Sequence, residues 1–316
     1  MPESGRRDCG EIDNPAADAT SRQPREGFAW IPSQTALLGS DDPRHPEEHP
    51  AHEVTVDGFW MQLHQVTNGE FGQFVDATAY VTIAERPIDP ADFPDAPPEN
   101  LQPGSMVFQR TAGPVDFRHL DQWWTWTPGA CWNHPRGPRS GLRDREHHPV
   151  VHVAFEDAAA YAAWAGLALP TEAQWEMAAR GGLVGATFTW GDAPERPGER
   201  LANYWHGEFP YLPDTGYGTT RPVGSFAPNG YGLYDMAGNV WEWTDYWWSD
   251  DRSVESCCSA DSYDGNQPQF AIGRRVVKGG SFLCADSYCL RYRPAARRPQ
   301  MVDTGMSHIG FRCIRP

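Results

Sequence analysis

The sequence predicts a single compact α+β domain with little regular secondary structure. The 316 residues include 31 Gly and 29 Pro, which favour turns, and 14 Trp, whose rings can fill a core between irregular segments. Apolar residues occur in short runs that alternate as in strands. The helical patterns are also short and begin at capping residues. These features indicate neither long helices nor a regular barrel, although the chain is long enough to bury a sizeable core.

Charge and cysteine content exclude several classes of protein. The formal net charge of −16 argues against nucleic acid or an anionic membrane surface as a partner. No run approaches the roughly 18 apolar residues of a membrane span, and the N-terminus lacks the apolar core of a signal peptide. The seven cysteines are odd in number and irregularly spaced, unlike a secreted disulfide framework. We therefore expect a cytoplasmic protein with mostly free thiols.

The first expected elements lie just after a polar tail. Residues 1–27 offer almost nothing to bury and are predicted to be a disordered tail, so the folded domain is expected to span residues 28–316. Two short apolar runs at residues 28–32 and 35–40 are expected to form strands around a turn. The acidic, Pro-rich residues 41–52 are typical of a surface loop, whose three histidines are expected to be solvated.

A strand, a helix and a long loop are expected next. Residues 52–61 alternate like one half-buried strand. Thr67 and Glu70 then form a capping-box pattern that predicts a short helix. Residues 86–118 carry many prolines and indicate a long ordered loop, of the kind that is often functional in compact domains.

Four indoles follow within residues 123–132, and at least one is expected to wall a cleft while the others pack in the core. Residues 148–153 are predicted to form a strand, and a helix is expected from Phe155 to Gly166. A further helix should begin after Thr171, which with Gln174 forms a second capping box, and should end at Gly181.

The most informative stretch, at residues 278–297, carries Cys284 and Cys289 between a double glycine and three arginines. Two thiols five positions apart can converge only if the chain between them bends. Three chemistries fit such a pair: a zinc site, which needs four ligands, a structural disulfide, or a redox or soft-metal pair. Thiolates select Cu(I), and the nearby Arg291 and Arg293 would favour the thiolate. The cysteine pattern alone does not choose between them.

Several motifs together resemble the formylglycine-generating enzymes, also called sulfatase-modifying factors. They are "LPTEAQWE" at residues 169–176, "GNVWEW" at 238–243, "GFRC" at 310–313 and the Gly-Gly-Ser-x-x-Cys-x₄-Cys frame at 279–289. The first three mark the wider superfamily, whereas the cysteine frame is the specific signal. The resemblance covers most of the folded chain and implies a fold related to C-type lectins.

This resemblance implies a chemistry and a partner. In such enzymes two cysteines bind Cu(I), here Cys284 and Cys289, and O₂ serves as co-substrate. A cysteine within a Cys-x-Pro-x-Arg segment of an unfolded sulfatase polypeptide is oxidised to Cα-formylglycine. Ser281 and Trp241 would shape the oxygen pocket, and Trp123 and Trp124 would line the peptide cleft. The alternatives are a non-catalytic lectin-like binding protein of the same fold and an oxidase resembling the iron-dependent sulfoxide synthases.

The resemblance also implies structural Ca²⁺. One expected ligand set is Asp235, Gly238, Val240 and Glu242. A second set, Asn203, Tyr204 through its carbonyl, and Tyr217, matches less well, because Thr215 stands where an Asp is expected and Asp214 would have to substitute for it. Cysteines that form disulfides in eukaryotic members are missing, which leaves Cys313 as an expected free core thiol.

Overall fold

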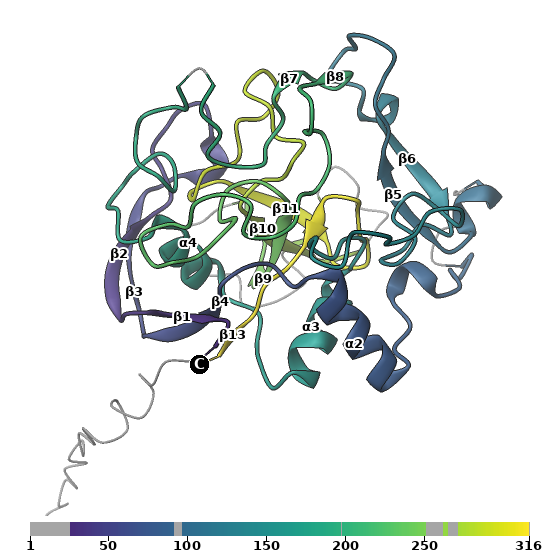
Figure 1. The fold of residues 1–316 in the computed structure, drawn as a ribbon, viewed down its shortest axis with the longest axis horizontal. Helices are drawn as coiled ribbons and strands as arrows, with labels where there is room; N and C mark the ends of the chain where they lie inside the picture. The colour runs from purple at the N-terminus through teal and green to yellow at the C-terminus, as the bar shows by residue number, and fades with distance from the viewer. Residues whose placement is uncertain (1–25, 92–96, 197, 251–261, 265–270, 316) are drawn as a thin grey trace, which may run out of the picture.

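The computed structural model describes residues 26–91, 97–196, 198–250, 262–264 and 271–315 (Figure 1). Residues 1–25, which make up nearly all of the predicted tail at residues 1–27, lie outside the described part. Cys9, Cys257 and Cys258 are outside it as well. Within the described residues, none of the helices is both long enough and apolar enough to cross a membrane.

A four-stranded sheet lies at the centre of the molecule (Figure 1). Its strand order is β11 (Arg297–Met301), β10 (Arg274–Lys278), β9 (Trp241–Trp247) and β12 (Ile309–Gly310). Strands β11, β10 and β9 are antiparallel, whereas β12 runs parallel to β9. This order brings the "GNVWEW" and "GFRC" motifs side by side and leaves the cysteine-bearing segment as the connection from β10 to β11.

Four smaller sheets surround the central one. β4 (Phe59–Gln62) pairs with both β1 (Phe28–Ile31) and β13 (Ile314–Arg315), so the two ends of the domain meet on one strand. The other three sheets are two-stranded: β2 (Gln34–Leu38) with β3 (His52–Val56), β5 (Gly104–Phe108) with β6 (Trp124–Pro128), and β7 (Gly207–Glu208) with β8 (Leu212–Pro213). The α+β class and the shortness of the elements agree with the sequence prediction.

Among the described residues, the three predicted α-helices form, two of them at the predicted capping boxes. α2 (Asn68–Thr78) and α4 (Glu172–Arg180) both begin at complete capping boxes, on Thr67 and Thr171. α3 (Phe155–Trp164) precedes Gly166, whose φ of +66° suits a chain reversal. Short 3₁₀ turns occur at η1 (Pro46–Glu48), η2 (Ile83–Glu85), η3 (Pro98–Leu101) and η4 (Leu120–Gln122).

Several sequence predictions of local structure are wrong. Residues 52–61 form two strands, β3 and β4, which pair with different partners. Residues 86–118 contain η3 and β5 and are therefore not one continuous loop. Residues 148–153 form no regular strand; the backbone turns at His152, whose φ is +61°, and the buried imidazole bonds to Ser105 and to the Pro135 carbonyl.

The predicted surface loop at residues 41–52 is also only partly correct. His45 is 7% exposed and Glu48 is fully buried, because η1 packs against the segment that follows the cysteines. His49 bonds to the Asp42 carbonyl at 2.7 Å. The loop is therefore a structural part of the site region.

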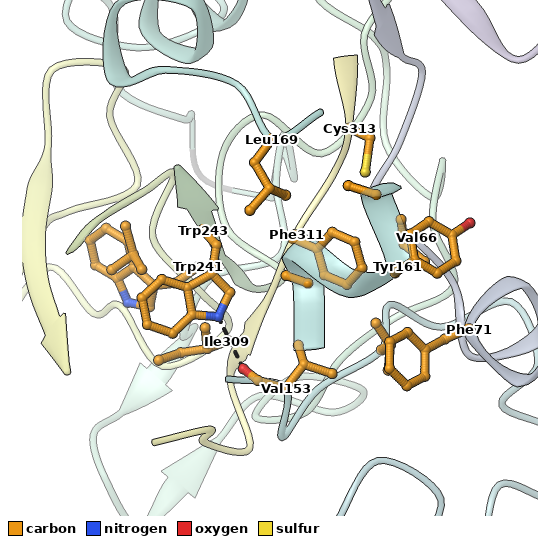
Figure 2. Packing of buried hydrophobic residues seen from close by; sticks show 14 of the residues in the cluster. Val66, Phe71, Val153, Tyr161, Leu169, Trp241, Trp243, Ile309, Phe311 and Cys313 are labelled. Atoms are coloured by element: carbon orange, nitrogen blue, oxygen red, sulfur yellow. Dashed lines mark hydrogen bonds between the residues drawn. The ribbon is translucent and has the colours of Figure 1, made fainter. Parts of the chain in front are cut away.

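The largest apolar cluster joins α2 and α3 to the central sheet and the C-terminal segment (Figure 2). Phe71, Tyr161 and Phe311 contact one another through ring edges and faces. The indole N–H of Trp243 donates to the Val153 carbonyl at 3.0 Å, which satisfies a polar atom that would otherwise be costly to bury. Cys313 lies in this cluster as a free thiol, as predicted, and burial raises its pKa.

Helix α4 holds both ends of the cysteine-bearing connection through two buried carboxylates. Glu176 accepts from the ammonium of Lys278, the last residue of β10, at 2.9 Å. Glu172 binds the fork of Arg297, the first residue of β11, at 2.9 and 3.1 Å. These side chains are almost completely buried, so each charge depends on its partner.

We predict that Glu176→Gln destabilises the protein by about 3–5 kcal/mol, because Arg180 loses its buried counter-charge and Lys278 keeps only the more distant Glu172 at 3.6 Å. The matched control is Glu156→Gln, since Glu156 is 59% exposed in its pair with Arg86 and should change stability by less than about 1 kcal/mol. Denaturant unfolding followed by circular dichroism measures both. Equal effects in the two variants would contradict an anchoring role for α4.

Candidate active site

The connection from β10 to β11 turns back on itself twice. A Cβ at Gly280 would lie 2.6 Å from the Arg291 carbonyl oxygen, so only glycine permits this approach of the two ends of the loop. Farther along, the amides of Tyr288, Cys289 and Leu290 all donate to the Ala285 carbonyl, at 3.0, 2.9 and 3.1 Å. Leu290 has a φ of +45°, which lets the chain leave this turn toward β11. The predicted bend between the two cysteines is therefore present.

Cys284 and Cys289 come into contact across this bend as free thiols. The Cys284 thiol donates a hydrogen bond to Cys289, which together with the Arg291 amide and the charges of Arg291 and Arg298 lowers the pKa of Cys289 to about 7. Burial and the same neighbour raise the pKa of Cys284. The pair thus favours one thiolate and one thiol.

The arginines after the cysteines do not all contact the groups that the sequence predicts. Arg291 lies beside the thiols, as predicted, and pairs with Glu47 at 2.7 Å. Arg293 does not act on the thiols, because its buried fork binds Glu48. The second charge near Cys289 comes instead from Arg298, on β11.

A cavity of about 420 Å³ opens above the two thiols. All six residues predicted for catalysis and peptide binding line it: Ser281, Cys284, Cys289, Trp241, Trp123 and Trp124. The side chains of Trp123 and Trp241 are buried and form part of the cavity wall. Trp124 is half-buried, and Leu120, which also lines the cavity, is exposed. The Ser281 oxygen accepts from the Leu283 amide at 3.2 Å, which fixes the hydroxyl at the wall.

Several other residues of this cavity escape prediction from the sequence. Phe209 stacks on Tyr288 at a centroid distance of 4.6 Å, and His308 packs against Trp124 at 4.7 Å. Asp121 and Arg298 place opposite charges in the lining. Tyr288 could have been suspected because it adjoins Cys289, and His308 because it directly precedes the "GFRC" motif region, whereas Phe209 comes from a distant segment that carries no such signal.

Comparison with known proteins identifies the family. Residues 14–316 match the family model described as "Sulfatase-modifying factor enzyme 1-like domain". The formylglycine-generating enzyme of Mycobacterium tuberculosis is 52% identical over 277 residues, which cover 85% of this chain and 91% of that protein. The chain belongs to the formylglycine-generating enzyme family. The enzyme of Thermomonospora curvata is 45% identical over 94% of this chain and 96% of its own length, so the similarity to bacterial members extends over nearly their whole length.

The fold is shared more widely than the family. The structure of PvdO from Pseudomonas aeruginosa superposes with a TM-score of 0.61 over 91% of this chain and 93% of that chain, at 24% sequence identity. This likeness bears on the fold alone, and the predicted fold class is confirmed. Membership of the family likewise confirms the prediction of an oxidase that acts on cysteine with O₂.

The first predicted calcium set does not fit calcium in this structure. Both oxygens of Glu242 are occupied: they accept from Arg312 at 2.7 and 2.8 Å, from Trp175 at 2.7 Å and from Gln65 at 2.9 Å. These donors fill the lone pairs with which the carboxylate would bind an ion. Asp235 already accepts from the Gly224 amide, and the backbone carbonyls of Gly238 and Val240 alone fall short of the six to eight oxygens that calcium takes. Glu242 is therefore the partner of Arg312.

The second predicted calcium set has one suitable atom. The Oδ1 atom of Asn203 is buried and unpaired. Asp214, which would have to substitute for the expected Asp, already pairs with Arg200 at 3.1 Å. Of this set, the Asn203 oxygen is the one side-chain atom left free for an ion, and calcium at these residues stays a prediction.

Zinc at the cysteines also lacks ligands. Among the described residues, the one cluster of three groups that could hold a metal is His45, Glu47 and Glu48. Both of its carboxylates are paired with Arg291 and Arg293. The cluster is therefore already neutralised, and neither of its acids joins Cys284 or Cys289.

We predict that alkylation of Cys289 by iodoacetamide in reduced, metal-free protein rises with pH through a midpoint near 7, because only the thiolate reacts. Arg298→Met should move this midpoint to higher pH, since it removes a neighbouring positive charge. Arg118→Met is the control and should leave the midpoint unchanged, because Arg118 is exposed, does not line the cavity and is already paired with Asp116. Peptide mapping by mass spectrometry gives the rates, and a midpoint at or above the ordinary thiol pKa in the unmodified chain would contradict the assignment.

Proposed function

We propose that this chain oxidises a cysteine in a Cys-x-Pro-x-Arg segment of a sulfatase polypeptide to Cα-formylglycine, using Cu(I) held by Cys284 and Cys289. One observation carries the proposal: the two thiols contact each other at an indole-walled cavity. Family membership supports the reaction, and the cysteine pair supports the copper site.

The donor set fits Cu(I) better than the other metals considered. Two sulfur atoms are soft ligands, and a d¹⁰ ion accepts coordination by two thiolates and leaves room for a third sulfur. When bound, the copper would receive the substrate sulfur and activate O₂. The contribution of the chain is to supply one thiol with a pKa of about 7 and to place Arg291 and Arg298 where they favour negative charge on sulfur.

The remaining wall residues control the surroundings of the reacting sulfur. Trp123, Trp241 and Tyr288 present ring surfaces that exclude water from the bottom of the cavity. The hydroxyl of Ser281, which is fully buried, offers a fixed polar group beside Cys284. A mostly apolar cavity with a few placed polar groups is typical of a small-ligand pocket such as one for O₂.

The substrate in this proposal is an extended, unfolded peptide. A cysteine inside a folded sulfatase could not reach the two buried sulfurs, whereas Leu120 and Trp124 at the cavity can pack along an extended backbone. Asp121 can pair with the motif arginine. We also propose a cytoplasmic location, which is supported by the four described cysteines, all free thiols.

We predict that a Cys-x-Pro-x-Arg peptide incubated with the protein, Cu(I) and O₂ gains an aldehyde, and that Cys284→Ser and Cys289→Ser each abolish turnover, because one thiolate cannot supply the two-sulfur site. Cys131→Ser is the matched control, since Cys131 lies outside this cavity. Mass spectrometry detects the product. Turnover retained in either site variant would refute the copper site, and reaction of intact folded sulfatase alone would refute the peptide substrate.

We predict that Asp121→Arg raises KM for this peptide roughly two- to fivefold, as expected for an exposed ion pair, with little change in kcat. The same variant should improve binding of a peptide whose motif arginine is Glu. Asp116→Arg is the control, because Asp116 pairs with Arg118 outside the cavity lining. If Asp121→Arg and Asp116→Arg have the same KM as each other for the Arg peptide, and also for the Glu peptide, then Asp121 does not recognise the motif arginine.

A further inference from the structure

A second cavity of about 200 Å³ lies behind one wall of the active-site cavity. The wall consists of residues from β5, residues 281–283 at the start of the connection from β10 to β11, and residues 306–308. Neighbouring residues of these segments line opposite cavities: Met106, Ser281, Leu283, Met306 and His308 line the active site, whereas Val107, Phe108, Phe282 and Ser307 line the second cavity. The Phe108 amide donates to the Ser307 hydroxyl at 3.0 Å within this wall.

Two arginines with no acidic partner line the second cavity. Neither Arg136 nor Arg145 has a carboxylate within ion-pair distance among the described residues, although the chain holds 42 acidic residues against 26 Lys and Arg. By contrast, Arg180, Arg293 and Arg297 are all paired with carboxylates. Exposed arginines such as Arg139 and Arg143 also have no carboxylate at this distance among the described residues, so what distinguishes Arg136 and Arg145 is that both line one cavity.

Arg145 is held in place by buried polar groups. The buried Asn68 side chain donates from Nδ2 to the Arg145 carbonyl at 2.8 Å, which fixes the backbone. One guanidinium nitrogen of Arg145 donates to the Thr220 hydroxyl at 3.5 Å, and Thr220 is only 7% exposed. The backbone of Arg145 is thus fixed at the cavity, and its half-buried side chain makes one long contact there.

Further polar groups in the lining lack partners. The indole N–H of Trp132 is buried without a hydrogen bond and is a donor of the kind an anion uses, whereas the unpaired Oδ1 atom of Asn68 is an acceptor and does not bind an anion. Burial and the nearby positive charge of Arg136 also lower the pKa of Arg145, as expected when two guanidinium groups approach one another without an anion between them.

We propose that this cavity binds an oxyanion between Arg136 and Arg145. Guanidinium groups bind phosphate and carboxylate through paired N–H donors, and the Thr220 hydroxyl is a further polar group of the lining, whereas the Ser140 hydroxyl already donates to the Gly137 carbonyl. The volume accommodates one such anion with water. Binding of a free anion here requires neither copper nor the Cys-x-Pro-x-Arg peptide, whereas binding of an acidic side chain of the substrate rests on the proposed function.

The oxyanion can come from two sources that share this chemistry. One source is a free inorganic anion such as phosphate. The other is an acidic side chain of the polypeptide substrate, which could reach the outer side of the shared wall while the cysteine lies in the active-site cavity. The experiment therefore has one arm for each source, and both arms measure binding, so that a failure of turnover does not affect them.

In the first arm, sodium phosphate is titrated into the full-length protein by calorimetry and thermal unfolding, against sodium chloride at equal ionic strength. We expect saturable phosphate binding that is weakened at least tenfold in Arg145→Gln and in Arg136→Gln. The matched controls are Arg139→Gln and Arg143→Gln, because these exposed arginines lie on the same segment but do not line the cavity. They should bind phosphate like the unmodified protein.

In the second arm, motif peptides with an Asp/Glu tail and an Asn/Gln tail are compared for binding. A preference for the acidic tail that is lost in Arg136→Gln and Arg145→Gln assigns the site to the substrate. Arg136 is exposed, so its variant should fold even if that of Arg145 does not. The proposal is overturned if neither phosphate nor the acidic tail binds saturably, or if the cavity variants bind them as well as the controls do.

Discussion

The active-site region depends on the two buried carboxylates of helix α4. Glu176 and Glu172 bind Lys278 and Arg297, the residues at which the cysteine-bearing loop leaves β10 and enters β11. Glu47 and Glu48 then hold Arg291 and Arg293 within the same loop. Because a buried charge without its partner is very unfavourable, these four pairs restrict the loop to one path. The two thiols can meet because that path is fixed.

Arginine serves three different purposes in this fold. Arg293, Arg297 and Arg312 are buried in pairs with carboxylates and support the structure. Arg291 and Arg298 lie near the thiols, where they favour a thiolate. Arg136 and Arg145 line the second cavity without an acidic partner among the described residues. The surroundings of each guanidinium, not its position in the sequence, determine which purpose it serves.

Local signals are sufficient for much of the fold and for the centre of the site. The capping boxes at Thr67 and Thr171 place α2 and α4, and the spacing of Cys284 and Cys289 requires the bend that the structure shows. The sequence does not show the partner of a charged residue when that partner lies far along the chain. Sequence analysis alone therefore assigns Arg293 to the thiols and Glu242 to calcium, whereas they bind Glu48 and Arg312.

The central claim is that Cys284 and Cys289 together form the copper site at the cavity. X-ray absorption spectroscopy at the copper edge of Cu(I)-loaded protein tests it most directly, because sulfur ligands are counted without any need for turnover. The account predicts one copper per chain with two sulfur ligands, and a third sulfur after addition of a Cys-x-Pro-x-Arg peptide. Copper bound only through nitrogen or oxygen, or an unchanged spectrum in Cys289→Ser, would contradict it.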